Sequence, residues 1–404
     1  MKKYVSLIIL PLFIIVMIGY FYIEVQSATK YYPRYQFEKI SGNEAVVKDL
    51  VVTGEFSYDA FGFESFQVDS EGTTYYHDES FLRKNYYGYQ EFKLESLINN
   101  YRNFMRGKAP FVQYFYETDE MVAYSSVLSD ITGFDYTNFK IAVLDKSTKD
   151  VDEFTVPIPN VDDYYNVTVE QVYLDSNEIY IITINERMNN EGMTSAEDVH
   201  VYVFDFEKEE MVRHEIIGKV ESFQTEQGYK IIEILKDESE ENGSFVMFEI
   251  EGTYIDEFEN HKYGETLKLN QGIKFNVLTN ETEKLKVDDS IGEPLAMLGN
   301  EVFFANVGEK TLDISVYDTE SLTIKNDLSI PTEESLKVQD LYNPRLENGK
   351  LYIVPSADEE RLETDIFVID LAKLETEYIG KVSLVEPLQI DNVSVYFNRI
   401  ELRD

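Results

Sequence analysis

The sequence predicts an all-β fold made of about five or six repeated units, each with about four strands. Two short strand patterns recur along residues 111–404, and turn-forming residues accompany each copy. Apolar residues make up 43% of the chain and aromatic residues 14%, more than an acidic disordered chain carries. We therefore expect a folded protein with a large hydrophobic core.

Residues 4–23 (YVSLIILPLFIIVMIGYFYI) contain no charge and follow Lys2 and Lys3. Twenty residues of helix rise about 30 Å, the thickness of the hydrocarbon layer of a membrane. The two lysines favour a cytoplasmic N-terminus, and tyrosines at the ends of the segment are typical of membrane interfaces. The sequence thus predicts an anchor helix within residues 1–28 of a single-pass cell-membrane protein, with the C-terminal domain extracytoplasmic.

A cleaved signal peptide is the alternative interpretation of this segment. Val25-Gln26-Ser27 before Ala28 has the small residues that a signal peptidase accepts, although the apolar stretch exceeds the usual 7–15 residues. Cleavage would make the protein secreted. The lysine start and the Ile/Leu-rich core are typical of bacterial export in either case.

The chain carries 36 Lys and Arg against 76 Asp and Glu, a net charge of −40. This charge repels phosphate backbones and excludes nucleic acid as a general partner. The absence of cysteine excludes disulfides, thiolate metal sites, a thiol nucleophile and a lipid-bearing cysteine.

Charge divides the chain near residue 110. Residues 1–110 hold 12 basic and 13 acidic side chains, whereas residues 111–404 hold 24 and 63. We therefore expect a membrane-proximal region at 29–110, able to approach anionic lipid or wall polymer, and an acidic head at 111–404. The plainer interpretation is that the acidic surface keeps the head soluble.

Residues 91–106 predict an amphipathic helix. Its apolar residues recur on one helical face, and Gly107 and Pro110 follow it: Leu94, Leu97, Ile98, Tyr101, Phe104 and Met105. We expect this face to pack on the adjoining sheet. Lys93, Arg102 and Arg106 leave open contact with a membrane or an acidic partner.

The first recurring strand pattern is apolar, any residue, Val, apolar, then Asp or Thr. It occurs at residues 141–145 (IAVLD), 201–205 (VYVFD), 275–279 (FNVLT), 314–318 (ISVYD) and 366–370 (IFVID). The final Asp or Thr can bond to its own backbone two residues later, which favours a turn and a return strand. Each copy therefore predicts a hairpin.

The second pattern is a strand opened by a turn residue, upstream of each hairpin. Its copies are residues 120–124, 177–182, 228–232, 300–304 and 349–354, with a sixth at 392–397 that has no hairpin after it. Strands that lead in, such as residues 169–174 and 293–298, complete units of about four strands. Four strands in 40–60 residues suit a propeller blade.

These segments resemble the blades of β-propellers of the YVTN and quinoprotein-like type, and residues 316–319 (VYDT) resemble them most. The resemblance implies a disc of radial sheets with loops on two faces, a binding platform without an implied catalytic residue. The unpaired strand at 392–397 suggests that an N-terminal strand, at residues 64–69 or 47–56, closes the ring. A set of β-sandwiches is the alternative fold.

No recognised catalytic or cofactor motif occurs, so we assign no catalytic, cofactor-binding or metal-binding residue. The four histidines, His77, His200, His214 and His261, lack the spacing of a helical zinc site. Residues 237–261 hold nine carboxylates and no Lys or Arg, which indicates a solvated insertion. A calcium site there is the alternative, although the order of an EF-hand loop is missing.

The function that these observations favour is non-enzymatic. We expect a membrane-anchored extracytoplasmic binding or regulatory protein whose partner is a protein, a peptide or a cell-envelope polymer, with no prediction of its oligomeric state. Tyr75-Tyr76 and the tyrosines of residues 86–89 could grip a polymer, but the lack of Trp weakens sugar stacking. The alternative is a polysaccharide hydrolase that uses carboxylates in the central channel.

Overall fold

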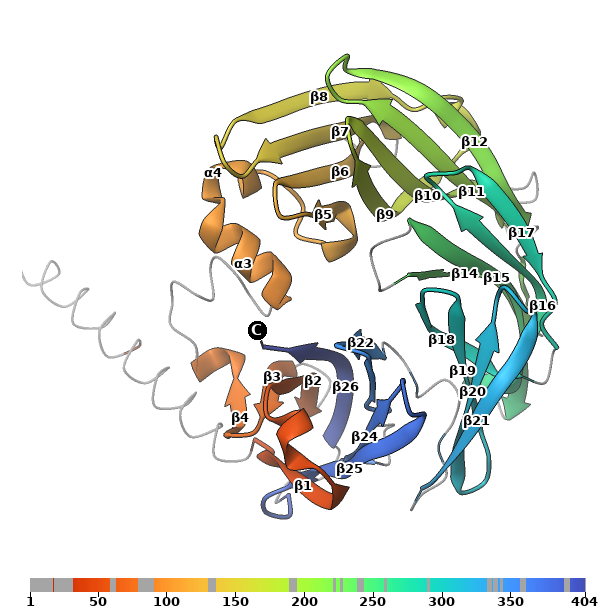
Figure 1. Cartoon of the computed structure of the whole chain (residues 1–404). Helices are drawn as coiled ribbons and strands as arrows, with labels where there is room; N and C mark the ends of the chain where they lie inside the picture. Colours follow the sequence, from red (N-terminus) through yellow and green to blue (C-terminus); the bar gives the residue numbers. More distant parts are fainter. Residues whose placement is uncertain are drawn as a thin grey trace, which may run out of the picture.

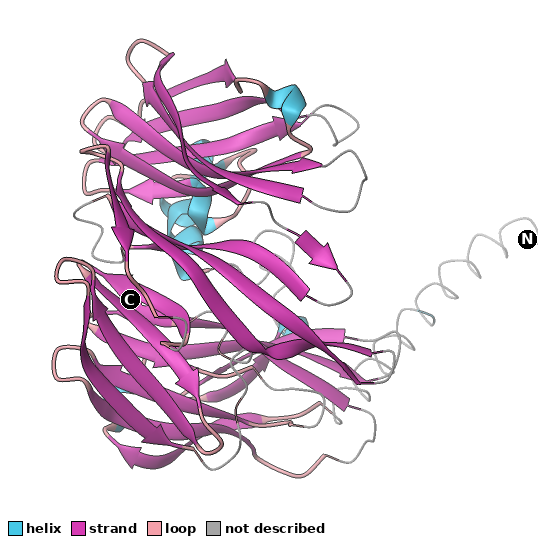
Figure 2. Ribbon diagram, turned by 90° about the vertical axis from the view of Figure 1, so that its right-hand side faces the viewer, coloured by secondary structure: helices cyan, strands magenta, loops and turns pink. Residues whose placement is uncertain are grey.

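The computed structural model describes residues 17, 32–58, 63–78, 91–129, 136–188, 195–220, 223–225, 228–237, 243–257, 260–288, 291–332, 336, 341, 344–356, 361–388 and 393–403. The described strands form six antiparallel sheets, four with four strands and two with five. The sheets are arranged radially around a common centre (Figure 1), and their strands cross the thickness of the ring (Figure 2). The predicted all-β, propeller-like architecture is confirmed.

We number the sheets as blades 1 to 6. Blade 1 holds β26 (Val393–Leu402), β2 (Leu50–Tyr58), β3 (Phe63–Asp69) and β4 (Gly72–Tyr75); blade 2 holds β5 (Phe115–Glu117), β6 (Met121–Ser129), β7 (Tyr136–Asp145) and β8 (Val151–Pro157). Blade 3 holds β9 (Asn166–Asp175), β10 (Glu178–Met188), β11 (Ser195–Asp205) and β12 (Glu210–Val220); blade 4 holds β13 (Phe223–Thr225), β14 (Gly228–Lys236), β15 (Ser244–Glu257), β16 (Asn260–Asn276) and β17 (Glu281–Leu285). Blade 5 holds β18 (Glu293–Leu298), β19 (Glu301–Val307), β20 (Thr311–Asp318) and β21 (Thr323–Pro331); blade 6 holds β22 (Arg345–Glu347), β23 (Lys350–Ile353), β24 (Thr364–Asp370), β25 (Glu375–Leu384) and β1 (Tyr35–Gly42). Short 3-10 helices are η3 (Glu44–Val47), η4 (Tyr76–Asp78), η5 (Val112–Tyr114) and η6 (Val161–Asp163).

Both ends of the chain close the ring. The C-terminal β26 pairs with β2, so blade 1 combines the last strand with three N-terminal strands, as the sequence suggested. β26 is the innermost strand of that blade and does not take the second position that its sequence pattern indicated (Figure 1). A second closure was not predicted from the sequence: β1 adds to β25 as a fifth strand on the rim of blade 6. Residues 35–75, which the sequence placed in a membrane-proximal region, thus contribute strands to two blades.

The predicted hairpins share one turn. In four blades the strand ends at an Asp whose Oδ1 accepts a backbone N–H two or three residues later, at Asp145, Asp205, Asp318 and Asp370. The fourth residue after each strand end is left-handed, with φ of 64° at Lys149, 55° at Glu209, 56° at Leu322 and 50° at Leu374. This geometry returns the chain as an antiparallel strand.

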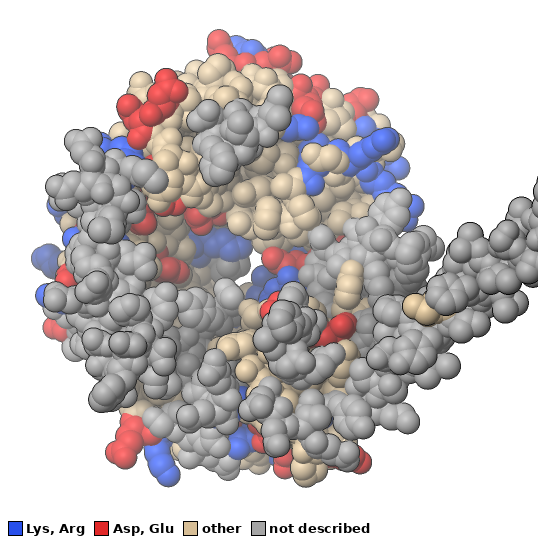
Figure 3. All heavy atoms as spheres, turned by 180° about the vertical axis from the view of Figure 1, so that it is seen from behind, with Lys and Arg blue, Asp and Glu red and all other residues tan. Residues whose placement is uncertain are grey.

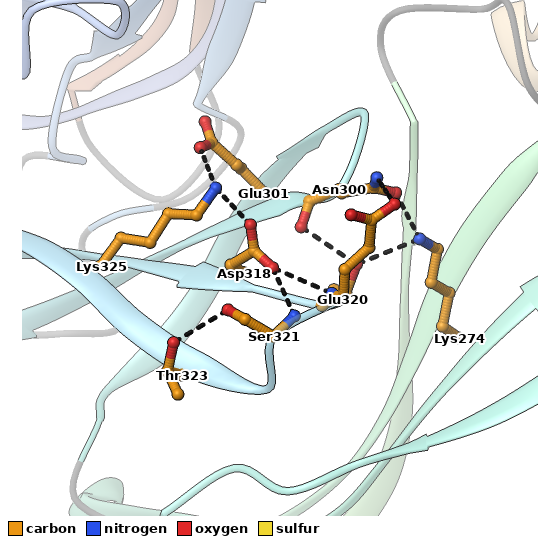
Figure 4. Close-up of polar contacts among 9 residues, drawn as sticks. Lys274, Asn300, Glu301, Asp318, Glu320, Ser321, Thr323 and Lys325 are labelled. Atoms are coloured by element: carbon orange, nitrogen blue, oxygen red, sulfur yellow. Dashed lines mark hydrogen bonds and ion pairs between the residues drawn. The ribbon is translucent and has the colours of Figure 1, made fainter.

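Figure 4 shows this turn in blade 5. Asp318 accepts bonds from the N–H groups of Glu320 and Ser321 and pairs with Lys325. Lys325 also contacts Glu301, at 3.1 Å. These contacts lower the pKa of Asp318 to about 2, with the bond from Lys325 as the largest cause. The Asp at the first position of this turn is therefore ionised at neutral pH.

Blade 4 uses the same turn, but three residues earlier than the sequence predicted. β16 ends at Asn276, whose Oδ1 accepts the N–H groups of Leu278 and Thr279 at 3.0 and 2.9 Å. Asn280, the fourth residue after Asn276, has a φ of 59°. The match of residues 275–279 to the first pattern was therefore wrong in register, because an Asn replaces the usual Asp.

Apolar seams join the blades in sequence from blade 2 to blade 6, and blade 6 to blade 1. Representative buried residues are Phe139 and Ile181 (blades 2 and 3), Val201 and Phe275 (3 and 4), Phe248 and Phe304 (4 and 5), Ile314 and Ile369 (5 and 6), and Val382 and Phe66 (6 and 1). Burial of each side chain of this size contributes about 1.5–3 kcal/mol to the free energy of unfolding. The seams therefore bind the ring together.

The predicted helix is divided in two. α3 (Phe92–Asn100) and α4 (Arg102–Met105) are separated at Tyr101, whose φ of −132° and ψ of 47° lie outside the helical region. Asn99 and Asn100, which are weak helix formers, precede the break. Both helices lie between blades 1 and 2 (Figure 1) and bury Leu94 and Phe104 against blade 2, so the prediction of packing on a sheet is confirmed.

The predicted anchor at residues 4–23 lies outside the described residues, apart from Met17. Within the described part of the chain, no helix combines the length and apolarity needed to cross a membrane.

Tyr35 tests the closure by β1. It is 1% exposed and stacks on Phe66 with ring centroids 5.3 Å apart, and its carbonyl oxygen accepts a bond from Thr73 at 2.9 Å. We expect Tyr35→Ala to lower the free energy of unfolding by about 3–5 kcal/mol, because it empties a buried aromatic site. Urea unfolding measures the loss. The exposed Phe111 is the control: Phe111→Ala should cost less than about 1 kcal/mol, and equal losses in the two variants contradict the prediction.

Candidate functional site

Blade 1 has one apolar face and one polar face. Val52, Phe56 and Phe66 belong to the apolar seam with blade 6. The other face of the sheet carries polar side chains in register across three strands: Arg399 opposite Thr53, Thr53 opposite Gln67, and Glu55 opposite Ser65. We call the space between this face and α3 the wet seam. Among the described residues, no apolar cluster joins blade 1 to α3 as the other clusters join neighbouring blades.

A pocket of about 500 Å³ lies in the wet seam. Its lining residues come from three strands of blade 1 and from η4: Thr53, Gly54, Glu55, Ser65, Tyr76, Asn398 and Arg399. Figure 3 shows the molecule from behind, with acidic and basic atoms around the hollow at the centre of the ring. The volume lies within the 300–1,000 Å³ typical of small-molecule sites.

The pocket depends on a β-bulge in β26. Thr53 pairs with Arg399 and Gly54 with Phe397, so Asn398 is the extra residue. A bulge turns side chains out of the regular alternation, and here Asn398 and Arg399 both line the pocket. Gly54 is needed behind it, because a Cβ there would lie 2.6 Å from the Phe66 ring.

An ion pair connects the pocket to α3. Arg399 Nε lies 2.7 Å from Glu401 Oε1 as an ion pair, and the Phe92 N–H donates to Glu401 Oε2 at 2.6 Å. Burial raises the pKa of Glu401, while Arg399 and the Phe92 N–H oppose that rise. The Arg403 guanidinium lies 5.7 Å from the centre of the Phe92 ring. Polar and cation–π contacts thus hold α3 against blade 1.

A second group of ionisable residues lies toward the centre of the ring on blades 3, 4 and 5. Glu170 is the bulged residue of β9, Glu293 begins β18, and Glu233 lies on β14 beyond the short pairing with β13. Burial, with a contribution from Glu233, raises the pKa of Glu170 to about 7 and that of Glu293 to about 8. Burial also raises the pKa of Glu233. Three blades therefore place carboxyls with raised pKa values on strands near the centre of the ring.

Histidines meet in the seam between blades 2 and 3. His200 Nδ1 and His214 Nε2 are 2.8 Å apart, and the Tyr202 ring stacks on His214 with centroids 4.4 Å apart. Tyr164 Oη lies 3.2 Å from His200 Nε2, and Asp198 lies at 3.9 Å. Burial lowers the pKa of His200 to about 3 and also lowers that of His214. This buried network suits a structural role.

The sequence did not identify any of these groups as a site. Helical spacing was the wrong test for His200 and His214, because a β-hairpin brings them together. Tyr76 lines the pocket, whereas residues 86–89 lie outside the described residues. The alternation of polar and apolar residues at 52–56, unlike the apolar runs of other blades, is the signal that could have indicated the wet face.

The acidic stretch 237–261 belongs to blade 4. Asp237 is 2% exposed and accepts the Gly299 N–H at 2.8 Å, and the stretch continues into the long β15–β16 hairpin. Residues 238–242 and 258–259 lie outside the described residues. Within the described part of the chain, no three His, Asp or Glu side chains are placed to hold a metal ion.

Neither a protein-family model nor a curated protein matches the sequence. Among solved structures, cobalt-substituted Synechocystis ACO is 11% identical with a TM-score of 0.34, over 70% of this chain and 61% of its own. A luciferin-regenerating enzyme is 12% identical, over 67% of this chain and 74% of its own, with a TM-score of 0.30. The β-propeller domain of the Trilobed protease from Pyrococcus furiosus is 10% identical, over 69% of this chain and 98% of its own, with a TM-score of 0.24. At these values the propeller assignment depends on the six sheets themselves.

The titration of His200 can be predicted and measured by NMR. Because burial holds the pKa of His200 near 3, we expect its imidazole to stay neutral between pH 8 and 5. The unfolded state binds a proton below about pH 6.5, so this group makes the folded state less stable as the pH falls. Imidazole chemical shifts measure the titration. A His200 midpoint near 6.5 contradicts the prediction.

For Glu293 we predict the opposite dependence of stability on pH. Its folded pKa of about 8 exceeds the ordinary value of 4.5, so the stability that it contributes at low pH is lost as the pH rises through 8. We expect Glu293→Gln to raise the free energy of unfolding at pH 8.5 by at least about 1 kcal/mol relative to its effect at pH 5. Thermal melts at the two pH values measure the difference. The exposed Glu375→Gln is the control and should show none.

Proposed function

We propose that the chain is a membrane-anchored extracytoplasmic binding protein whose ring holds a cell-envelope polymer or peptide. The single observation that carries this proposal is the pocket of about 500 Å³ in the wet seam. A sheet face that carries polar side chains at an interior position of the ring forfeits the apolar burial found at the other seams, about 25 cal/mol per Å². A binding role accounts for that cost.

The apolar segment at residues 4–23 supports the proposed location. Its length suits a bilayer, and Lys2 and Lys3 favour a cytoplasmic N-terminus. With β1 beginning at Tyr35, a short stretch would separate the anchor from the rim of blade 6. The alternative is a secreted protein released by cleavage before Ala28.

Charge supports the choice of partner. The net charge of −40 disfavours polyanions, whereas neutral polymers, peptides and basic proteins meet no such repulsion. The pocket itself presents one guanidinium, one carboxylate and several neutral groups. Partners that form hydrogen bonds are therefore favoured over partners recognised by charge alone.

A second function, hydrolysis of an extracellular polysaccharide, is favoured by a different observation. Glu170 and Glu293, with pKa values raised to about 7 and 8, are carboxyls that can carry a proton at neutral pH. A general acid in glycoside hydrolysis needs this property, together with a second carboxylate. Glu233 interacts with both, and burial raises its pKa as well.

The test is retention of envelope material by the full chain in detergent. We expect wild-type protein to retain a polymer or peptide fraction, and Glu55→Gln with Ser65→Ala to reduce retention at least about fivefold, because the first replaces a charged acceptor by a neutral amide and the second removes a hydroxyl. Ser125→Ala in blade 2 is the control. Retention that the double variant leaves unchanged contradicts the pocket as the site. Release of reducing ends by wild type but not by Glu293→Gln favours the hydrolase instead.

A further inference from the structure

The surface around α4 is basic, although the chain as a whole carries a net charge of −40. Residues 92–111 hold four basic side chains and one acidic one. Figure 3 shows basic atoms gathered at the upper right of the ring, which is the side of α4 in Figure 1 because the view is from behind. Salt at physiological strength screens charges that lie more than about 8 Å away. A partner in contact with α4 therefore meets the local positive charge rather than the net negative one.

Two arginines of this surface are available to a partner. Arg102 and Arg106 are about one helical turn apart, and both are exposed. Neither has an ion pair or a hydrogen bond within the described part of the chain. Glu153 of blade 2 is already shared by Lys108 and Lys140, at 3.3 and 3.1 Å. Among the described residues, the two guanidinium groups thus have no counter-charge.

An exposed aromatic ring lies on the same segment. Phe111 is 52% exposed, and its ring packs edge-on against Tyr114 with centroids 5.3 Å apart. Tyr114 contacts Tyr124, and the ammonium of Lys108 lies 5.3 Å from the centre of the Tyr124 ring. These contacts connect Phe111 to the basic surface. We call Arg102, Arg106 and Phe111 the basic patch. Basic side chains beside an exposed aromatic ring are typical of surfaces that lie on a bilayer.

The proposed anchor, on which this inference depends, favours a bilayer over a soluble polyanion as the partner. Residues 24–34 separate the apolar segment from Tyr35, and an extended chain of this length spans at most about 40 Å. The starts of β1 and α3 both contact blade 1, since Tyr35 bonds to Thr73 and Phe92 to Glu401. The tether would therefore hold this part of the ring near the membrane, at a high effective concentration of lipid.

We propose that the basic patch lies on the anionic lipid surface of the membrane that holds the anchor. Arg102 and Arg106 pair with phosphate groups of the lipids, and Phe111 enters the boundary between headgroups and acyl chains. The contact orients the ring, with α4 toward the lipid and blades 4 and 5, on the opposite side of the ring, away from it. The acidic part of the chain is thereby kept from an anionic surface that would repel it.

The experiment reconstitutes the full chain in vesicles and reads the surroundings of α4. The chain has no cysteine, so Asn103→Cys, at an exposed position between the two arginines, accepts a single environment-sensitive dye. The vesicles contain phosphatidylcholine alone or with about 30% phosphatidylglycerol, an anionic lipid. We expect dye emission at least about twofold brighter in the anionic vesicles at about 0.1 M salt, and loss of the difference at about 1 M salt.

Variants of the basic patch separate lipid contact from folding. Each arginine near an anionic surface contributes about fivefold, so Arg102→Gln with Arg106→Gln should lower the ratio of docked to undocked chain about 25-fold. Phe111→Ala should lower this ratio about threefold or more, because an apolar ring no longer enters the bilayer. All three side chains are exposed, so the melting temperature should not fall. The matched control, Lys284→Gln with Lys310→Gln, removes the same charge from exposed positions on blades 4 and 5 and should dock as wild type does.

The remaining outcomes distinguish this inference from the proposed function. Equal dye emission in the two kinds of vesicle overturns the lipid contact, and so does an equal loss in the lysine control. Binding of soluble polyphosphate without a response to anionic vesicles makes a polyanion the partner and overturns the bilayer. These three outcomes leave the proposed membrane location standing. A chain that separates from both kinds of vesicle at every salt concentration overturns that location, and the lipid contact with it.

Discussion

The structure depends on the pairing of β26 with β2. These strands come from opposite ends of the chain, and their hydrogen bonds join residues almost 350 positions apart. Without that pairing, blade 1 would lose its innermost strand, and the apolar face made by Val52, Phe56 and Phe397 would lose part of its seam with blade 6. The pairing of β1 with β25 is a second such closure, and together the two long-range pairings turn a row of sheets into a ring.

The wet seam lies on the other face of the same blade. Where blades 2 to 6 bury apolar residues on both faces, blade 1 turns polar groups toward α3, and the helices cover blade 2 instead. Contacts across the seam among the described residues include the bond that the Phe92 N–H donates to Glu401 and the approach of Arg403 to Phe92. Such contacts hold position while leaving room for a polar ligand, which an apolar seam could not do.

The strands could be predicted from the sequence because their causes are local. A run of β-formers followed by an Asp that accepts a bond from the backbone of its own turn predicts a hairpin without knowledge of distant residues. The register of the blade 4 hairpin was wrong because Asn276 takes the place of this Asp. The pocket has no such local cause. It needs Thr53 beside Arg399, and the register that places them together depends on a bulge at Asn398. The carboxyls on blades 3, 4 and 5 are likewise assembled only by the ring.

The position of β1 has a mechanical consequence. β1 is the outermost strand of blade 6, and Tyr35 at its start pairs with Leu384 near the end of β25. Tension applied to the residues before Tyr35 therefore acts first on the β1–β25 pairing and on the contacts of Tyr35 with Phe66 and Thr73 of blade 1, before it reaches β26. If residues 4–23 anchor the chain as proposed, β1 would be the first strand of the ring to bear a pulling force.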